Sequence, residues 1–202
     1  MNLRTELPIA ENSSNFNAVA DAATKAGTTL ENLKAAVAGE TGASAKYAAF
    51  AKAAKEQGFD QLARLWEATS AAEQIHINLE ASLVEAEDPS YTRPTAEAPA
   101  PEAIDLNLIA SANGEIFETS DMYPTFIKKA QEEGHAKAVK VFTRAKLAEA
   151  VHAEKYLEAY NNIDAADDDA YYLCPGCGYI HKGDDFEKCP ICGVPKAKFQ
   201  RF

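Results

Sequence analysis

Apolar and polar residues recur with helical spacing along most of this chain. The pattern becomes clear at Thr28, which forms a capping-box signature with Glu31 and opens an alanine-rich amphipathic stretch that ends near Gly58. Residues 1–27 lack such periodicity, and we expect at most a short helix there, around Phe16–Lys25. The first long helix is therefore predicted to lie between Thr28 and Gly58.

A second helical pattern runs from Asp60, which we expect to act as its N-cap, to Glu87, where Asp88-Pro89 stops it. The next stretch, residues 88–101, contains four prolines and is predicted to be extended. A helix of roughly 27 residues is about 40 Å long, and roughly 14 extended residues reach about 46 Å. This connector can therefore return along a whole bundle and set the second and third helices parallel, as in ferritin-like four-helix bundles.

Two more helical segments follow, one over Glu102–Glu133, which Pro124 should bend or open, and one from His135 to Asn162. Residues 164–170 contain four aspartates and are predicted to form a solvated hinge, with docking of a redox partner as an alternative. The predicted fold class is mainly α, a four-helix bundle with a small C-terminal β module. We divide the chain into an N-terminal extension (1–27), the bundle (28–163), the acidic hinge (164–170) and the module (171–202).

Composition narrows the classes of partner. The 202 residues are 47% hydrophobic, enough to bury one sizeable core beside a small metal-held module. A net charge of -11 argues against nucleic acid or an anionic membrane as a partner, because binding to those surfaces requires clusters of lysine and arginine. No apolar stretch has the length of a signal peptide or a membrane span, so we expect a cytoplasmic protein whose thiols stay reduced.

All of the cysteines lie near the end of the chain, in two C-x-x-C hairpins that are each followed by glycine. Four thiolates so spaced can surround one metal ion as a tetrahedron. Zinc and iron both suit this arrangement. A structural zinc ribbon has similar spacing, whereas the repeated Cys-Pro-x-Cys-Gly motif and the aromatic residues near it favour iron. The predicted ligands are Cys174, Cys177, Cys189 and Cys192.

The two halves of the helical region resemble each other at an offset of 76 residues. Phe50–Gly58 aligns with Phe126–Gly134, and each half carries one Glu-x-x-His pair. Spacing of three residues sets the carboxylate and the imidazole on one helical face. The offset superposes Tyr47 on Tyr123, Trp66 on Phe142, Glu73 on Glu149 and His76 on His152.

The duplication slips by one residue in the third helix. Glu40 precedes Tyr47 by seven residues, whereas Glu115 precedes Tyr123 by eight. We predict a π-type bulge there, linked to Pro124, that re-aims the nearby glutamates into the bundle.

One glutamate from each of two helices and a Glu-x-x-His pair from each of the other two fill the template of a dinuclear metal site in a bundle core. Five inward glutamates would be untenable in a dry core without cations, and two iron ions nearly balance their charge. A lone Glu-x-x-His pair is usually a solvated helix face, but two copies at the duplicated offset favour the site. The candidate ligands are Glu40, Glu73, His76, Glu115, Glu118, Glu149 and His152, although Glu118 could instead face solvent.

The chain resembles rubrerythrins, which join a ferritin-like diiron bundle to a C-terminal rubredoxin-like domain. The resemblance covers about residues 29–202, and residues 1–28 look like an extension. It implies two iron ions in the bundle and one in the four-cysteine site, where zinc could replace iron in recombinant protein. The motifs that carry the resemblance are Gly39-Glu40, Glu73-x-x-His76, Gly114-Glu115-x-x-Glu118, Met122-Tyr123-Pro124, Glu149-x-x-His152 and the two cysteine hairpins.

The resemblance also implies a role for each candidate ligand. Glu73 and Glu149 would bridge the irons, Glu40 and Glu115 would be terminal ligands, and His152 would hold the second iron. His76 and Glu118 would exchange at the first iron, His76 in the reduced state and Glu118 in the oxidised state. Tyr47 and Tyr123 would hydrogen-bond ligand carboxylates, although ordinary core packing is an alternative for both tyrosines.

The function implied is a peroxidase active in oxidative-stress defence. The diferrous centre would reduce hydrogen peroxide to water, with electrons relayed through the cysteine iron from rubredoxin or an NAD(P)H-dependent reductase. A ferroxidase or iron-handling protein, or an electron carrier without turnover, are the alternatives. Because a chain's own cysteine site could lie far from its own diiron site, we expect a head-to-tail homodimer or higher oligomer, with a domain swap possible.

Overall fold

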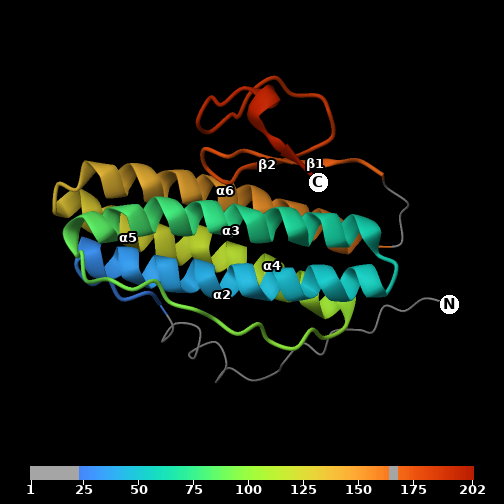
Figure 1. Ribbon diagram of the computed structural model, residues 1–202, viewed down its shortest axis with the longest axis horizontal. Helices are drawn as coiled ribbons and strands as arrows, with labels where there is room; N and C mark the ends of the chain where they lie inside the picture. Colours follow the sequence, from blue (N-terminus) through green and yellow to red (C-terminus); the bar gives the residue numbers. More distant parts are fainter. Residues whose placement is uncertain (1–22, 164–167) are drawn as a thin grey trace.

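The computed structural model describes residues 23–163 and 168–202, which form a long helical bundle with a small β module on one side (Figure 1). The expected short helix at Phe16–Lys25 falls mostly outside these residues, and its described part, residues 23–25, is not helical. Part of the acidic hinge, residues 164–167, also lies outside them.

The first two helices are the predicted pair. Helix α2, Thr29–Glu56, begins at Thr28 with both hydrogen bonds of the capping box to Glu31. Helix α3, Asp60–Glu87, follows a turn in which Gly58 has a φ of 82°, a conformation that favours glycine. The prediction that Asp60 caps α3 is wrong. Phe59 precedes the helix and makes no side-chain cap, because backbone hydrogen bonds close the turn and the Phe59 ring packs on the core.

The connector between α3 and the next helix runs along the length of the bundle (Figure 1). The chain then turns back through α4, Ile104–Phe117, the π-helix η1, Glu118–Met122, and α5, Tyr123–Glu132. This third helical rod runs parallel to α3, as the length of the connector predicted. Helix α6, Ala136–Asn161, completes a four-helix bundle of the ferritin-like kind.

The predicted π-type bulge is present. Within η1 the helix widens, and the backbone N–H of Tyr123 bonds to the carbonyl of Glu118, five residues earlier. Pro124 follows at once and has no N–H to continue a regular ladder. The extra residue in this turn explains why the sequence duplication slips by one between Glu115 and Tyr123.

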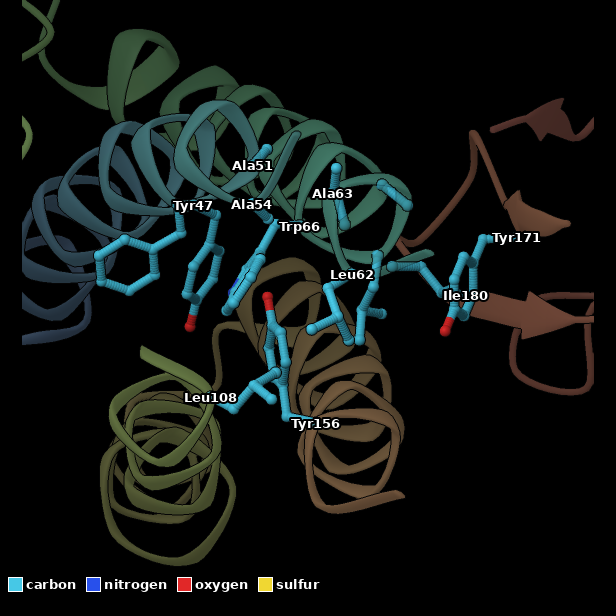
Figure 2. Close-up of a cluster of buried hydrophobic side chains, with 14 of the residues drawn as sticks. Tyr47, Ala51, Ala54, Leu62, Ala63, Trp66, Leu108, Tyr156, Tyr171 and Ile180 are labelled. Atoms are coloured by element: carbon cyan, nitrogen blue, oxygen red, sulfur yellow. The ribbon is translucent and has the colours of Figure 1, made fainter. Parts of the chain in front are cut away.

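The C-terminal module is a three-stranded antiparallel sheet with the order β2-β1-β3. Its strands are β1, Tyr171–Leu173, β2, Ile180–Lys182, and β3, Gln200–Arg201, with a 3-10 turn, η2, at Lys196–Lys198. Tyr171, Leu173 and Ile180 belong to the same buried cluster as Leu62 and Trp66 of α3, so the module is packed on the bundle (Figure 2).

The core cluster that the bundle shares with the module contains aromatic residues from three helices, α2, α3 and α6. The Trp66 ring packs near those of Phe50 and Tyr156, with centroids 5.6 and 6.3 Å away, and its indole N–H donates to the hydroxyl of Ser111. Figure 2 shows Trp66 beside Tyr156. Trp66 is therefore a packing residue with its polar atom satisfied. In the described ranges, no helix has the length and apolar character needed to cross a membrane.

Candidate metal centres

Six ionisable side chains meet in the middle of the bundle, although they come from four different helices. Glu73 and His76 lie one helical turn apart on α3, and Glu149 and His152 lie one turn apart on α6. Glu40 reaches in from α2 and Glu115 from α4. All six side chains are at most 1% exposed, so the structure brings the predicted residues together in a dry core.

Their ligand atoms form two overlapping groups, each with all of its atoms within 4.8 Å of one another. One group holds Glu40, Glu73, His76 and Glu149, and the other holds Glu73, Glu115, Glu149 and His152. Glu73 and Glu149 belong to both groups. Two shared carboxylates, with one further glutamate and one histidine on each side, are what a pair of bridged metal ions requires.

The histidines orient this cluster. Each presents its Nδ1 atom to the carboxylates, at 2.6 Å from Glu149 for His76 and 2.7 Å for His152. The two rings are stacked, with centroids 6.2 Å apart. Each Nε2 atom points the other way, toward the β module. A metal ion could therefore be bound by the Nδ1 atom of each imidazole, on the side of the carboxylates.

Several oxygen and nitrogen atoms of the cluster form no well-aligned hydrogen bond among the described residues, although those of Glu149 and His152 lie close to each other as an ion pair. The atoms without such a bond are Oε2 of Glu40, Oε1 of Glu73, Oε2 of Glu115, both oxygens of Glu149 and Nδ1 of His152. Leaving such buried atoms unpaired is costly, so a bundle core without cations would be unstable here. Hard carboxylate oxygens with two imidazole nitrogens suit iron, and these residues fit a pair of iron ions.

The charges show the same need for cations. Burial, followed by repulsion from Glu118 and Glu149, raises the pKa of Glu40 well above its ordinary value. Burial likewise raises the pKa of Glu115, to about 8. Burial is the largest single influence on His76 and lowers its pKa, but the charge of Glu149 and the hydrogen bonds to Glu149 and Glu73 together outweigh burial, so the net shift is upward. In the absence of metal, protons would have to supply the missing positive charge.

The two predicted tyrosines contact the cluster in a crossed arrangement. Tyr47 of α2 donates its hydroxyl hydrogen to Glu115 of α4, and Tyr123, at the start of α5, donates to Glu40 of α2. Both hydroxyls are buried. Each tyrosine thus orients a carboxylate from the opposite half of the duplication.

Glu118 lies at the edge of this centre. It begins the π-helix η1, is 9% exposed, and is in neither group of clustered ligand atoms. Burial and the nearby charge of Glu115 raise its pKa well above the ordinary value, whereas Lys46 acts in the opposite direction. The structure therefore places Glu118 beside the cluster, with His76 inside it.

One buried glutamate near the cluster was not predicted from the sequence. Glu80 of α3 is fully buried, and its Oε1 atom lies within hydrogen-bond distance of the Tyr123 hydroxyl, at 2.9 Å. It follows His76 by four residues and therefore lies on the same helical face. The pattern Glu-x-x-His-x-x-x-Glu was the available signal.

The four cysteines meet within the β module. All lie in the described part of the chain, none is paired in a disulfide, and their sulfur atoms lie within 4.8 Å of one another. The Sγ atoms of Cys174 and Cys192 are 3.4 Å apart, and those of Cys177 and Cys189 are 3.5 Å apart. Sulfur atoms about 2.3 Å from one metal ion would be about 3.8 Å apart at the corners of a tetrahedron, so the group can hold a single ion.

The module contacts the histidines directly. Nε2 of His76 donates to the backbone carbonyl of Cys177 at 3.0 Å, and Nε2 of His152 donates to that of Gly178 at 2.8 Å. A Cβ atom at Gly178 would lie 2.3 Å from Nε2 of His76, so only glycine permits this approach. The expectation that a chain's own cysteine site lies far from its own glutamate cluster is therefore wrong for this arrangement. The structure of one chain does not test the predicted oligomer.

Comparison with known families agrees with both sites. The family model described as "Rubrerythrin" matches residues 31–160, and the model described as "Rubrerythrin, rubredoxin-like domain" matches residues 172–200. The bundle thus carries a diiron-type carboxylate and histidine site, and the module carries a rubredoxin-like four-cysteine iron site.

Individual relatives match along most or all of the chain. Nigerythrin from Nitratidesulfovibrio vulgaris is 66% identical over the full length of both chains. Rubrerythrin from the same organism is 34% identical and aligns with 87% of this chain and 95% of its own. A solved structure described as the fully reduced, all-ferrous state of nigerythrin covers both chains completely, with a TM-score of 0.89. The extension 1–27 is thus included in a full-length relative.

The raised pKa values of the buried groups predict how the metal-free protein responds to pH. Between about pH 5 and 8 the folded state keeps protons on Glu115 that the unfolded state has lost, so the free energy of unfolding falls as pH rises. The raised pKa of His76 acts in the same direction, because its stabilising charge is lost as pH rises. Each unit of pKa shift corresponds to about 1.4 kcal/mol.

Urea denaturation at several pH values would measure this fall, with chelator-treated and iron-loaded protein compared side by side. The loaded protein should show a much flatter dependence, because bound ions keep the carboxylates ionised in the folded state. A metal-free protein whose stability increased across this range would contradict the assignment.

Removing the extra residue of the π-helix should disable the bundle site. Deletion of Ser120, an exposed residue of η1, would restore a regular helix and turn the two sides of the rod by about 100° relative to each other. Glu115 and Tyr123 could then no longer both face the cluster. We expect fewer bundle metal ions per chain with the far-ultraviolet circular dichroism retained. The matched control, Ser120→Ala, keeps the chain length and should bind iron normally; equal iron in both variants would refute the role of the π-helix.

Proposed function

The chain belongs to the rubrerythrin family, whose members are generally oxidoreductases, and we propose that it is a diiron peroxidase. It would reduce hydrogen peroxide to water with electrons that enter through the four-cysteine iron, as part of cytoplasmic defence against oxidative stress. The observation that supports this most is the direct hydrogen bonding between the cysteine module and both histidines of the bundle site. A storage protein does not need such an electron entry point.

The residue roles in this proposal follow the two groups of ligand atoms. Glu73 and Glu149, which both groups share, would bridge the two ions. Glu40 and His76 would complete the first ion, and Glu115 and His152 the second. Two ferrous ions held there would supply the two electrons that peroxide reduction needs.

The module fixes the tautomer of both histidines in this scheme. Because backbone carbonyls accept from Nε2 of each ring, the Nε2 atoms must carry the hydrogens. The Nδ1 lone pairs are then directed at the carboxylate cluster, where a metal ion would be bound. The same hydrogen bonds give electrons a short route from Cys177 to His76.

Glu118 and His76 are proposed to exchange at the first ion. Glu118 begins the π-helix, a widened turn that can rearrange with little loss of regular hydrogen bonding. The oxidised, harder ion would prefer the additional carboxylate, and the reduced, softer ion would prefer the imidazole. The arrangement described, with His76 in the cluster and Glu118 beside it, resembles the reduced form.

We further propose that the cysteine iron is reduced by rubredoxin or by an NAD(P)H-dependent reductase. Whether the module docks on its own bundle or on that of a partner depends on the hinge, and the two arrangements would form the same contacts. We therefore keep the head-to-tail homodimer as a proposal. Sedimentation of the iron-loaded protein would test it.

Peroxide should be the preferred oxidant. If iron-loaded protein is reduced anaerobically and mixed with hydrogen peroxide or dioxygen, visible absorbance should return much faster with peroxide. Equal rates would indicate an oxidase.

A large cage with a mineral core and rapid oxidation of added ferrous iron would instead support the iron-handling alternative. Glu149→Ala should abolish peroxide reduction while the cysteine iron is retained. A simple electron carrier would keep its function in this variant.

Close docking of the module should control the rate of internal electron transfer. Gly178→Ala adds a methyl group where His76 lies and should displace the carbonyl contacts, and displacements of about 1 Å can slow a reaction by about a hundredfold. Gly193→Ala is the matched control, because Gly193 follows the other cysteine hairpin with a φ of 80° but its Cβ would meet nothing within 4 Å.

Stopped-flow mixing of the fully reduced proteins with peroxide would separate the two variants. We expect oxidation of the cysteine iron to slow by about tenfold or more in Gly178→Ala alone, with iron content unchanged. Equal slowing in both variants would show that backbone strain within the module, rather than docking, controls the rate.

A further inference from the structure

Glu80 is a buried acid that the proposed ligand set does not use. It is fully buried, and within the described residues its Oε2 atom has no hydrogen-bond partner. Its Oε1 atom lies 2.9 Å from the hydroxyl of Tyr123, which also contacts Oε1 of Glu40. Tyr123 therefore connects Glu80 to a candidate metal ligand through a single oxygen atom.

The number of hydrogens shared by Glu80, Tyr123 and Glu40 determines the protonation state of Glu80. Tyr123 has one hydroxyl hydrogen and cannot donate it fully to two carboxylates. If its hydrogen goes to Glu40, the contact with Glu80 forms a good hydrogen bond only when Glu80 is the neutral acid and donates to the Tyr123 oxygen. Burial, the largest influence, raises the pKa of Glu80 to about 8, which agrees with that state.

The other half of the duplication lacks this acid. At the 76-residue offset, Glu80 corresponds to Tyr156, whose hydroxyl is hydrogen-bonded to Thr69. Tyr47, the counterpart of Tyr123, contacts Glu115 without a second carboxylate behind it. Glu80 is therefore an addition to one half of the site, and the symmetry of the helices alone does not require it.

Reduction of hydrogen peroxide needs protons in a site from which water is excluded. Each molecule takes up two electrons and two protons to give two molecules of water. We propose that Glu80 stores one of these protons and delivers it through Tyr123 to Glu40. This inference rests on the proposed peroxidase function, with ferrous ions as the reductant and peroxide as the oxidant.

The transfer is a concerted shift along two hydrogen bonds. The O–H bond of Tyr123 breaks as a new O–H bond forms on Glu40, and the Glu80 proton re-forms the Tyr123 hydroxyl. This shift moves one proton from Glu80 to Glu40 with no change in electron count. Glu40 would then pass the proton to a peroxide oxygen as the O–O bond breaks, which leaves the Glu40 carboxylate ionised again. Glu80 acts through Tyr123, so it is a positioning and proton-supplying residue.

Tyr91, in the connector, is the group that we propose returns the proton to Glu80. The Tyr91 hydroxyl is buried and, among the described residues, has no hydrogen-bond partner. Its ring packs on Ile77 and Ala81, which flank Glu80 on α3, and the charge of Glu80 is among the influences that raise the pKa of Tyr91. One water molecule between Tyr91 and Oε2 of Glu80 would satisfy both orphaned atoms.

Infrared spectroscopy of the iron-loaded, full-length protein tests whether the proton is stored. The oxidised protein is used because Glu118 is then also a proposed ligand. Bound ions keep the ligand carboxylates ionised, so a neutral Glu80 carboxyl should give a separate carbonyl band. We expect this band in the wild-type protein and in Glu67→Gln, a control at an exposed position of the same helix. It should be absent in Glu80→Gln. No band in the wild-type protein, or a band that persists in Glu80→Gln, would overturn the proposal.

Stopped-flow oxidation by peroxide, with a pH-indicator dye, tests delivery. In wild type and Glu67→Gln, oxidation should precede uptake of one proton from solution. Glu80→Gln keeps the size and hydrogen-bonding groups but cannot release a proton, so oxidation should slow by about tenfold or more and coincide with uptake. Oxidation at the wild-type rate in an iron-loaded Glu80→Gln protein would refute delivery.

Substitution of Tyr91 tests the return of the proton to Glu80. Tyr91→Phe should leave the first turnover unchanged and slow later ones, because only refilling is affected; unchanged later turnovers would refute that route. A wild-type protein that did not react with peroxide would disprove the peroxidase, while the infrared band would still decide whether Glu80 holds a proton.

Discussion

The structure depends on the burial of many carboxylates at one place. Glu40, Glu73, Glu115 and Glu149 are inaccessible to solvent, and their ligand oxygens belong to two overlapping groups whose atoms lie within 4.8 Å of one another. Desolvated charges of like sign strongly oppose folding unless cations join them. Metal binding is therefore part of the folding free energy of this bundle, and the helices are the scaffold that holds the ligands together.

Much of this arrangement could be predicted because helical periodicity and duplication make the relevant information local. A Glu-x-x-His pair shares a helical face wherever the helix lies, and an offset repeated in both halves implies that the faces meet. The one-residue slip before Tyr123 even located the π-helix η1, because an inserted residue must widen a helix or rotate one side of it. The connector predicted parallel rods from its reach alone.

Other features depended on contacts that no local pattern determines. Glu80 belongs to no repeated motif, and its importance comes from Tyr123, which lies 43 residues later in the chain. No local pattern determines where the module docks, so the contacts of Cys177 and Gly178 with the histidines could not be foreseen. The N-cap of α3 was misassigned because aspartate is a common cap, whereas backbone bonds after Gly58 already closed the turn.

The two histidines connect all of these features, because each ring uses one nitrogen for the carboxylate cluster and the other for the module. A cation bound at Nδ1 withdraws charge from the imidazole and makes its Nε2–H a stronger donor to the carbonyl of Cys177 or Gly178. Metal binding should then strengthen docking, and by thermodynamic reciprocity docking should increase metal affinity equally. The cysteine site would thus be held closest to the bundle when the bundle holds its metal ions, which is when electrons can be used.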